Sequence, residues 1–170
     1  MADGNPDLFE HPELRALRNF GVAPDLIEKY QVLCIPENIR EASTRDELVD
    51  AGNALDLTKA LKEAGVDTAG SYELTPEAKT IERRGGDLWF GIVWVLGSVA
   101  LPFFISVLAN IVTGWRSSKS GSATSGKAPM AHIRLRLKRG ENVVNIDYSG
   151  DGETFVDVLR ALKRGQEKQQ

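Results

Sequence analysis

A run of 28 residues without a charged side chain, residues 88–115, constrains the fold of this chain more than any other feature. It reads LWFGIVWVLGSVALPFFISVLANIVTGW. As an α-helix rising 1.5 Å per residue it would extend for about 40 Å, which is enough to cross a bilayer. The pattern therefore predicts a single transmembrane helix over residues 87–115. The alternative is the central buried helix of a globular domain, which can also be apolar on all sides.

The residues at the two ends of this segment match a membrane boundary. Trp89 and Trp115 lie where amphipathic indoles prefer the headgroup region, and basic side chains follow just outside them, at Arg83, Arg84 and Arg116. These five residues are the candidate membrane-interface positions. Basic residues are balanced between the two flanks, so orientation is poorly determined. Moving a short tail across a membrane is easier than moving a folded acidic domain, which favours a cytoplasmic amino terminus, whereas the basic carboxy-terminal part favours the opposite.

The apolar segment divides the chain into parts of different composition. The expected fold class is mostly α with a small α+β part: a helical amino-terminal domain, the transmembrane helix, a flexible linker and a ββα unit. We expect the following boundaries: a disordered tail over 1–11, the acidic helical domain over 12–86, the span over 87–115, a Ser/Gly-rich linker over 116–130, the basic ββα unit over 131–165 and a tail over 166–170.

The charge is distributed unevenly, since residues 1–87 carry a formal charge of −8 and residues 116–170 a charge of +5. The two ends should therefore meet different partners. The basic end has no aromatic residues interleaved with its positive charges for stacking on bases, so no nucleic acid is expected. The expected partners are the lipid bilayer, further copies of the chain and one or more unknown proteins.

The carboxy-terminal part alternates apolar and basic residues, as a half-buried strand does. Ile133, Leu135 and Leu137 would share one face and the intervening basic residues the other. A turn over 139–142 and a second alternating segment follow, and then an amphipathic helix. A two-stranded hairpin is only marginally stable, so this unit should pair an edge with another copy or with a partner.

Within the apolar segment, small, polar or helix-loosening residues recur at every fourth position: Ser98, Pro102, Ser106, Asn110 and Gly114. In a helix they would form one slanted stripe, and helices in lipid use such residues to approach each other. The amide of Asn110 would be costly against acyl chains without a partner. We therefore interpret these five residues as helix–helix contacts of a homo-oligomer. The alternatives are that the stripe lines a narrow pore, or that the chain is monomeric.

No constellation of catalytic, cofactor-binding or metal-binding residues is apparent. The segment 147–152 begins like a calcium loop, but Val158 occupies the position that requires a bidentate Glu. His11 and His132 lack a second His or a Cys at ligand spacing. We expect no enzyme activity, no cofactor and no metal. A third interpretation, an enzyme with an unrecognised site in residues 12–84, would require that fragment to turn over a substrate.

The carboxy-terminal half, from VLGSVALPFFISVLANIVTGWRS through HIRLRLKRGENVVNIDYSGDGETFVDVLRALKR, resembles the effector-associated constant components of bacterial conflict systems. Like them it has a long apolar helix, a linker, a basic hairpin and a terminal helix, over roughly residues 95–164. The resemblance implies a non-catalytic partner of a separately encoded effector, and it assigns no individual residue a role.

Together these features predict a single-pass membrane protein that oligomerises through its span and acts as a non-enzymatic adaptor or accessory subunit. The alternative is a pore-forming or membrane-disrupting effector controlled by its amino-terminal domain. Ion leakage on expression, abolished by Asn110→Leu, would favour the pore.

Overall fold

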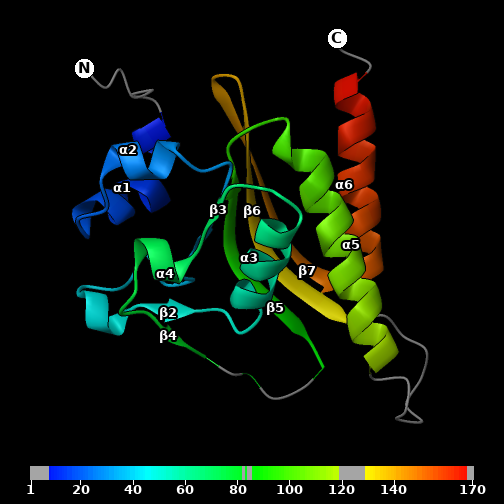
Figure 1. Ribbon diagram of the computed structural model, residues 1–170, viewed down its shortest axis with the longest axis horizontal. Helices are drawn as coiled ribbons and strands as arrows, with labels where there is room; N and C mark the ends of the chain where they lie inside the picture. Colours follow the sequence, from blue (N-terminus) through cyan, green and yellow to red (C-terminus); the bar gives the residue numbers. More distant parts are fainter. Residues whose placement is uncertain (1–7, 82, 84–85, 119–128, 168–170) are drawn as a thin grey trace.

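The computed structural model describes residues 8–81, 83, 86–118 and 129–167, with only the backbone described for 115–118 and 166–167. Its centre is a five-stranded mixed sheet in the order β3-β1-β5-β6-β7 (Figure 1). The strands are β1 Val32–Ile35, β3 Thr68–Ala69, β5 Leu88–Val95, β6 Met130–Arg139 and β7 Asn142–Asp151. A second sheet pairs β2 Val49–Asp50 with β4 Lys79–Thr80.

Helices cover the sheet on both sides (Figure 1). On one side, called here the helical face, lie α3 Ala54–Glu63, α5 Ala100–Ser118 and α6 Gly152–Glu167. On the other side, called here the open face, lie α1 Pro12–Asn19 and α2 Pro24–Glu28, which cover only part of it. The remaining short elements are the 3-10 helices η1 Leu8–Glu10 and η2 Arg45–Glu47, and the helix α4 Ser71–Leu74.

The uncharged segment is not one helix, so the predicted transmembrane helix over 87–115 is wrong. Its first eight residues form β5, which lies between β1 and β6 in the sheet. A strand buried on both faces has an uninterrupted apolar sequence, which is why β5 resembles half of a span. Among the described residues, no helix has both the length and the apolar character that crossing a membrane requires. The predictions of membrane localisation, single-pass anchoring and a pore all depended on that helix, and the structure contradicts them.

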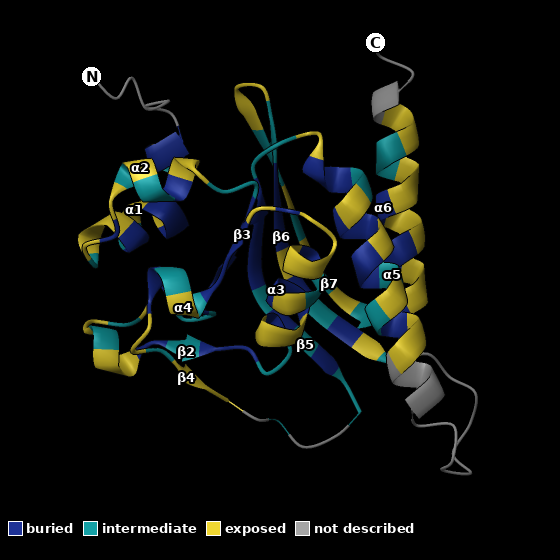
Figure 2. Ribbon diagram, viewed as in Figure 1, coloured by how far each residue is buried: buried dark blue, intermediate teal, exposed yellow. Residues whose placement is uncertain are grey.

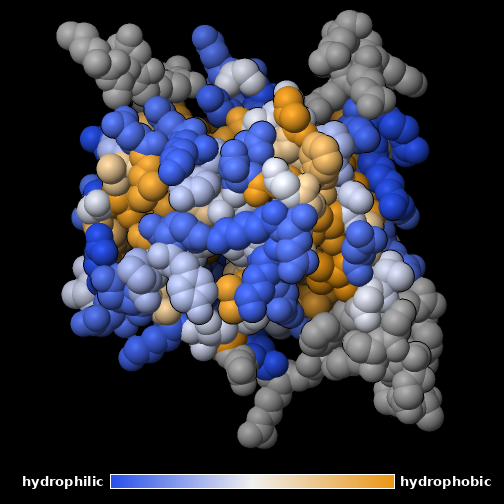
Figure 3. Space-filling model, viewed as in Figure 1, coloured by the Kyte–Doolittle hydropathy of each residue, from blue (hydrophilic) through white to orange (hydrophobic). Residues whose placement is uncertain are grey.

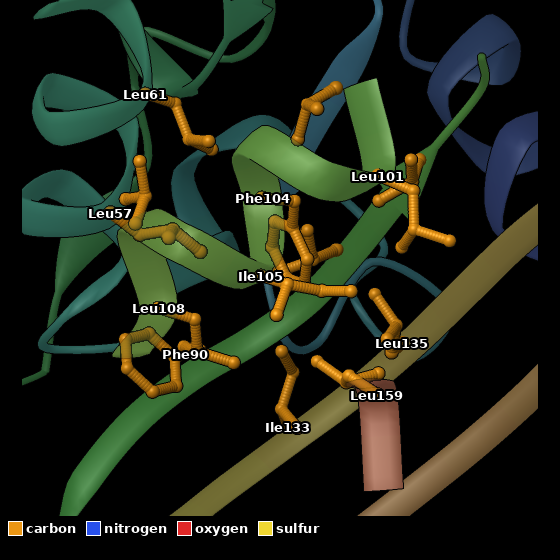
Figure 4. Close-up of a cluster of buried hydrophobic side chains, with 14 of the residues drawn as sticks. Leu57, Leu61, Phe90, Leu101, Phe104, Ile105, Leu108, Ile133, Leu135 and Leu159 are labelled. Carbon is orange, nitrogen blue, oxygen red and sulfur yellow. The ribbon is translucent and has the colours of Figure 1, made fainter. Parts of the chain in front are cut away.

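The second part of the segment forms α5, whose apolar side packs on the sheet. Its buried residues recur at helical spacing, namely Leu101, Phe104, Ile105, Leu108 and Val112. In Figure 4, Phe104, Ile105 and Leu108 lie among Phe90, Ile133 and Leu135 of the sheet. Pro102 is the third residue of α5, within the first turn, where a missing N–H breaks no helical hydrogen bond.

The predicted fold class, mostly α with separate soluble parts on both sides of a span, is also wrong. The amino-terminal part supplies β1 and β3 to the same sheet that contains β6 and β7. The strands β6 and β7 and the helix α6 occur in the expected order, but β6 pairs in parallel with β5 along seven residue pairs. The acidic and basic parts of the chain thus share one sheet.

A bulge in β5 directs its side chains to both faces. The register with β6 shifts between Trp89 and Gly91, and Gly91 has a φ of +73°. A Cβ at Gly91 would also meet the Cβ of Ala51 at 3.1 Å. The extra residue lets both Phe90 and Val93 face the helices although they are three positions apart, while Trp89 lies on the open face.

A second apolar core attaches α1 and α2 to the open face. It joins Leu14, Leu17 and Ile27 of the helices to Ile92 and Trp94 of β5. The chain is therefore buried on both sides of the central strands, as the dark blue segments of Figure 2 show. Towards the ends of β6 and β7 nearest β4, the open face is not covered by these helices.

Candidate functional site

The uncovered part of the open face contains a hollow of about 390 Å³, which we call the β5–β7 hollow. Its sides come from β5, β6 and β7 and from the segment after β1. The residues that line it are Glu37, Asn38, Arg83, Trp89, Gly91, His132, Ile133, Arg134, Asp147, Tyr148 and Ser149. It combines an aromatic surface with charged groups of both signs.

Three side chains stack at one side of this hollow. The rings of Trp89 and His132 are nearly parallel, 14° apart, with centroids separated by 3.8 Å. The guanidinium carbon of Arg83 lies 4.2 Å from the Trp89 ring centroid, in cation–π geometry. Arg83 also forms an ion pair with Glu37. Asn53 holds the backbone of Trp89: its side-chain oxygen accepts from the Trp89 N–H at 2.8 Å, and its backbone N–H donates to the Trp89 carbonyl at 2.8 Å. The indole is therefore held in one orientation.

A chain of hydrogen bonds runs through His132. Nε2 lies 3.0 Å from Oδ2 of Asp87, and Nδ1 lies 2.5 Å from Oγ of Ser149. With a proton on Nε2 donated to Asp87, Nδ1 can accept the hydroxyl proton of Ser149. These are the residue types of a Ser-His-Asp triad, but the two imidazole nitrogens have exchanged partners, since the triad joins Nε2 to the serine and Nδ1 to the aspartate. Ser149 is an exposed residue near the end of β7, so its hydroxyl is accessible.

Next to this chain, a buried ion pair joins α1 to the sheet. Glu13 is 6% exposed and Arg136 is 9% exposed. Glu13 accepts from Arg136 Nε at 3.1 Å and from the Trp94 indole N–H at 2.8 Å, while Arg136 Nη1 donates to Asp147 at 2.5 Å. Burial opposes the charge of Arg136, but hydrogen bonds to Asp147 and Glu13 raise the pKa of its guanidinium above the ordinary value.

Strand β7 forms one edge of the sheet. It pairs with β6 over ten consecutive residue pairs, from Asn142 opposite Arg139 to Asp151 opposite Met130, without a register shift. In the described part of the chain, no other strand pairs with it. The side chains of β7 on the open face are exposed at Asn145, Asp147 and Ser149. The opposite edge, β3, has only two residues.

The residues predicted as site residues lie in several places. Arg83 and Trp89 meet in the β5–β7 hollow, although their predicted place was a membrane boundary. Ser98 precedes α5 and is exposed, Pro102 is half-buried, and Ser106, Asn110 and Gly114 are exposed on the side of α5 that faces away from the sheet. Arg84 and the side chains of Trp115 and Arg116 lie outside the described residues.

The solvent-exposed surface at the amino-terminal end of α5 is apolar. Val99 is 68% exposed and Phe103 is 50% exposed. Figure 3 shows apolar surface over α5 and polar surface over the neighbouring α3. The stripe of small residues thus faces outwards beside exposed apolar side chains, and its predicted role in helix contacts stays a prediction.

The sequence interpretation missed Asp87, Arg134 and Ser149 and gave His132 no functional role. One signal could have indicated Arg134, Ser149 and the position of His132. The alternation in 132–138 and in 143–151, joined by a turn, places His132 opposite Ser149 and Arg134 opposite Asp147 once the register of the hairpin is set. The partner of His132 in the preceding segment could not be inferred, because that segment was interpreted as a span.

No protein-family model, no curated protein and no solved structure matches this chain.

Proposed function

We propose that this chain is a non-catalytic protein-binding module that accepts an extended segment of a partner protein as an additional strand along β7. The observation that carries the proposal is the free edge of β7, ten residues long and in regular register with β6. An edge strand presents a row of unpaired N–H and C=O groups, which form hydrogen bonds with an added strand.

Several of the features that protect an edge strand are missing from β7, although it carries the charged side chains of Asp147 and Asp151. It contains no proline and no lysine, and its pairing with β6 has no bulge. In the described part of the chain, β6 pairs with residues 142–151, and no helix or loop forms a further backbone hydrogen bond with them. An edge of this length supports recognition by main-chain hydrogen bonds.

The β5–β7 hollow would supply specificity for the partner. An added strand points alternate side chains to the open face, beside the hollow. There Asp147, whose side chain is 67% exposed, and Asp151 lie four residues apart with Ser149 between them. Charge complementarity favours a partner segment with basic residues at alternate positions. The resemblance to effector-associated constant components, which stays a prediction, would make the partner a separately encoded effector.

The proposal is tested by selecting peptides from a random displayed library against the purified chain. The affinity of the selected peptides is then measured by fluorescence polarisation. We expect enrichment of alternating sequences with basic residues, and slower amide hydrogen exchange over residues 142–151 when the peptide binds. Asn145→Lys introduces a lysine on the exposed edge and should weaken binding about tenfold or more.

Ser106→Lys is the matched control, because it adds the same charge at an exposed polar residue of α5. It should leave the affinity unchanged. Selected peptides that protect a different part of the chain, or that bind Asn145→Lys as well as the unaltered chain, would refute the proposal. Self-association that protects residues 142–151 would instead identify a second copy as the added strand.

A second candidate function is acyl hydrolysis, which the chain of contacts between Asp87, His132 and Ser149 favours. In this function Ser149 Oγ would attack a carbonyl carbon while Nδ1 of His132 accepts its proton and Asp87 orients the ring. The imidazolium would return that proton to the leaving group as its bond to the acyl carbon breaks, and water would then hydrolyse the acyl-Ser149 ester by the same route. Turnover of p-nitrophenyl acetate, lost in both Ser149→Ala and His132→Ala but retained in Ser106→Ala, would support it. Equal rates in all four proteins would exclude it.

A further inference from the structure

A separate cavity lies between α3, α4 and the small β2–β4 sheet. Its volume is about 210 Å³. Apolar side chains, including Ala51, Ala54 and Ala78, form one part of its walls, and polar groups form the rest. Tyr72 lines the cavity and is 77% exposed, so the cavity opens to the surface at this residue. An enclosed apolar cavity of about 150 Å³ can hold benzene, so this volume is sufficient for a small organic molecule.

One carboxylate faces this cavity. Asp50 is the last residue of β2 and is 8% exposed. Its Oδ2 accepts a hydrogen bond from the hydroxyl of Ser71, on α4. Among the described residues no cation forms an ion pair with Asp50, since Lys62 pairs with Glu73 and Arg83 pairs with Glu37. A buried carboxylate without an ion-pair partner carries a charge that its surroundings do not neutralise.

The groups around Asp50 do not compensate its charge. Burial raises the pKa of Asp50, the Ser71 hydrogen bond lowers it, and the negative charge of Glu37 raises it further. Cys34, on β1, also lines the cavity, and burial raises the pKa of its thiol to about 11. The thiol is therefore protonated and unsuited to nucleophilic chemistry. The hydroxyl of Thr58 donates to the Ala54 carbonyl at 2.8 Å.

We propose that this cavity binds a primary ammonium group carried on a short apolar chain, with Asp50 as its counter-ion and the alanine-rich wall around the alkyl part. The ammonium would donate hydrogen bonds to the Asp50 carboxylate and to the hydroxyl oxygen of Ser71. This site does not depend on the proposed function of β7, since it lies on different elements. The same chemistry occurs in free amines and in lysine side chains, and the test distinguishes these two sources.

The test is a titration of the ¹⁵N-labelled chain at pH 7 and constant ionic strength, followed by amide chemical shifts. The probes are n-butylammonium, 1-butanol and butyrate, which have similar size and different charge. We expect saturable shifts at Ala51, Ala54 and Ser71 with n-butylammonium, and a Kd on the order of 1 mM for a ligand of this size. The neutral and anionic probes should bind about tenfold more weakly or not at all.

A further arm replaces n-butylammonium by Nα-acetyl-lysine amide. Binding of both probes identifies any accessible lysine chain as a ligand, whereas binding of n-butylammonium alone indicates a free amine. Asp50→Asn should weaken n-butylammonium binding about tenfold or more, because the amide keeps the acceptor for Ser71 but removes the charge. Asp67→Asn is the matched control at an exposed position and should leave the affinity unchanged.

Ala54→Leu fills the cavity without changing a charge and should also abolish binding, so the test does not depend on one variant folding. The proposal is overturned if 1-butanol binds as tightly as n-butylammonium, if the shifts map to another region, or if no saturation occurs at about 20 mM.

Discussion

The buried contact between Glu13 and Arg136 allows the most detailed prediction from this structure. Glu13, on α1, accepts hydrogen bonds from Arg136 Nε at 3.1 and 3.2 Å and from the Trp94 indole at 2.8 Å. It connects residues separated by 123 positions in the chain. If the acidic amino-terminal part is integral to the fold, truncating this side chain must destabilise the whole protein.

The magnitude follows from the contacts that Glu13→Ala removes. Removing one partner of a buried ion pair costs about 3–5 kcal/mol of unfolding free energy. Leaving the buried indole N–H of Trp94 without an acceptor costs about 1–3 kcal/mol, and this overlaps with the first figure. Arg136 keeps Asp147 as a partner, whose side chain is 67% exposed, so we expect the lower part of the range, about 3–4 kcal/mol.

The assay is urea unfolding of the purified variants, followed by tryptophan fluorescence and by far-ultraviolet circular dichroism. Coincident transitions would justify a two-state free energy. Glu10→Ala is the matched control, because Glu10 is an exposed acidic residue three positions earlier, and it should stay within about 0.5 kcal/mol. The double variant Glu13→Leu with Arg136→Met should recover a large part of the loss, since no buried charge is left unpaired.

A loss below about 0.5 kcal/mol for Glu13→Ala would refute the reasoning. It would mean that α1 is not packed on the sheet, and the division of the open face into a covered and an uncovered part would fail with it.

Three further predictions concern the core, the bulge and Asp50. Phe104→Ala removes a fully buried ring between α5 and the sheet and should cost about 3–5 kcal/mol in urea unfolding, with Phe103→Ala, at a half-exposed position, costing much less. Gly91→Ala places a Cβ on a residue with φ of +73° and should cost about 1–2 kcal/mol, and an unchanged stability would contradict the bulge. Because burial raises the pKa of Asp50, its charge destabilises the fold at neutral pH. Asp50→Asn should therefore have a higher free energy of unfolding than the unaltered chain at pH 7. The difference should vanish near pH 3, where the carboxyl is protonated in both the folded and the unfolded state. A difference in the free energy of unfolding that does not depend on pH would contradict this prediction.

The sequence predicted the local structure of the carboxy-terminal part and misassigned the central segment for a physical reason. Alternation identifies a half-buried strand such as β6, whose residues 133, 135 and 137 face α5 and α6. A strand buried on both faces has no alternation, so β5 followed closely by an apolar helix has the composition of a span. The four residues 96–99, which include Gly97, separate the two elements, and a single glycine is also tolerated within a transmembrane helix.

The site was less predictable because it depends on pairings between distant segments. Arg83 and Trp89 stood out in the sequence, but as boundary residues, and their contact follows from the bulge at Gly91. The position of His132 between Asp87 and Ser149 requires β5 and β7 to flank β6. Parallel pairing of β5 and β6 across an intervening helix leaves no local sequence signal from which this order could be read.

The most direct test of the central claim, that residues 88–95 form an internal strand of the sheet, is a nuclear magnetic resonance analysis of this segment. The account predicts Cα and Cβ shifts typical of a strand over Leu88–Val95, with nuclear Overhauser effects joining Cys34 to Val93 on one side and Val93 to Leu135 on the other. Shifts typical of one uninterrupted helix from 88 to 115, without these cross-strand effects, would contradict it.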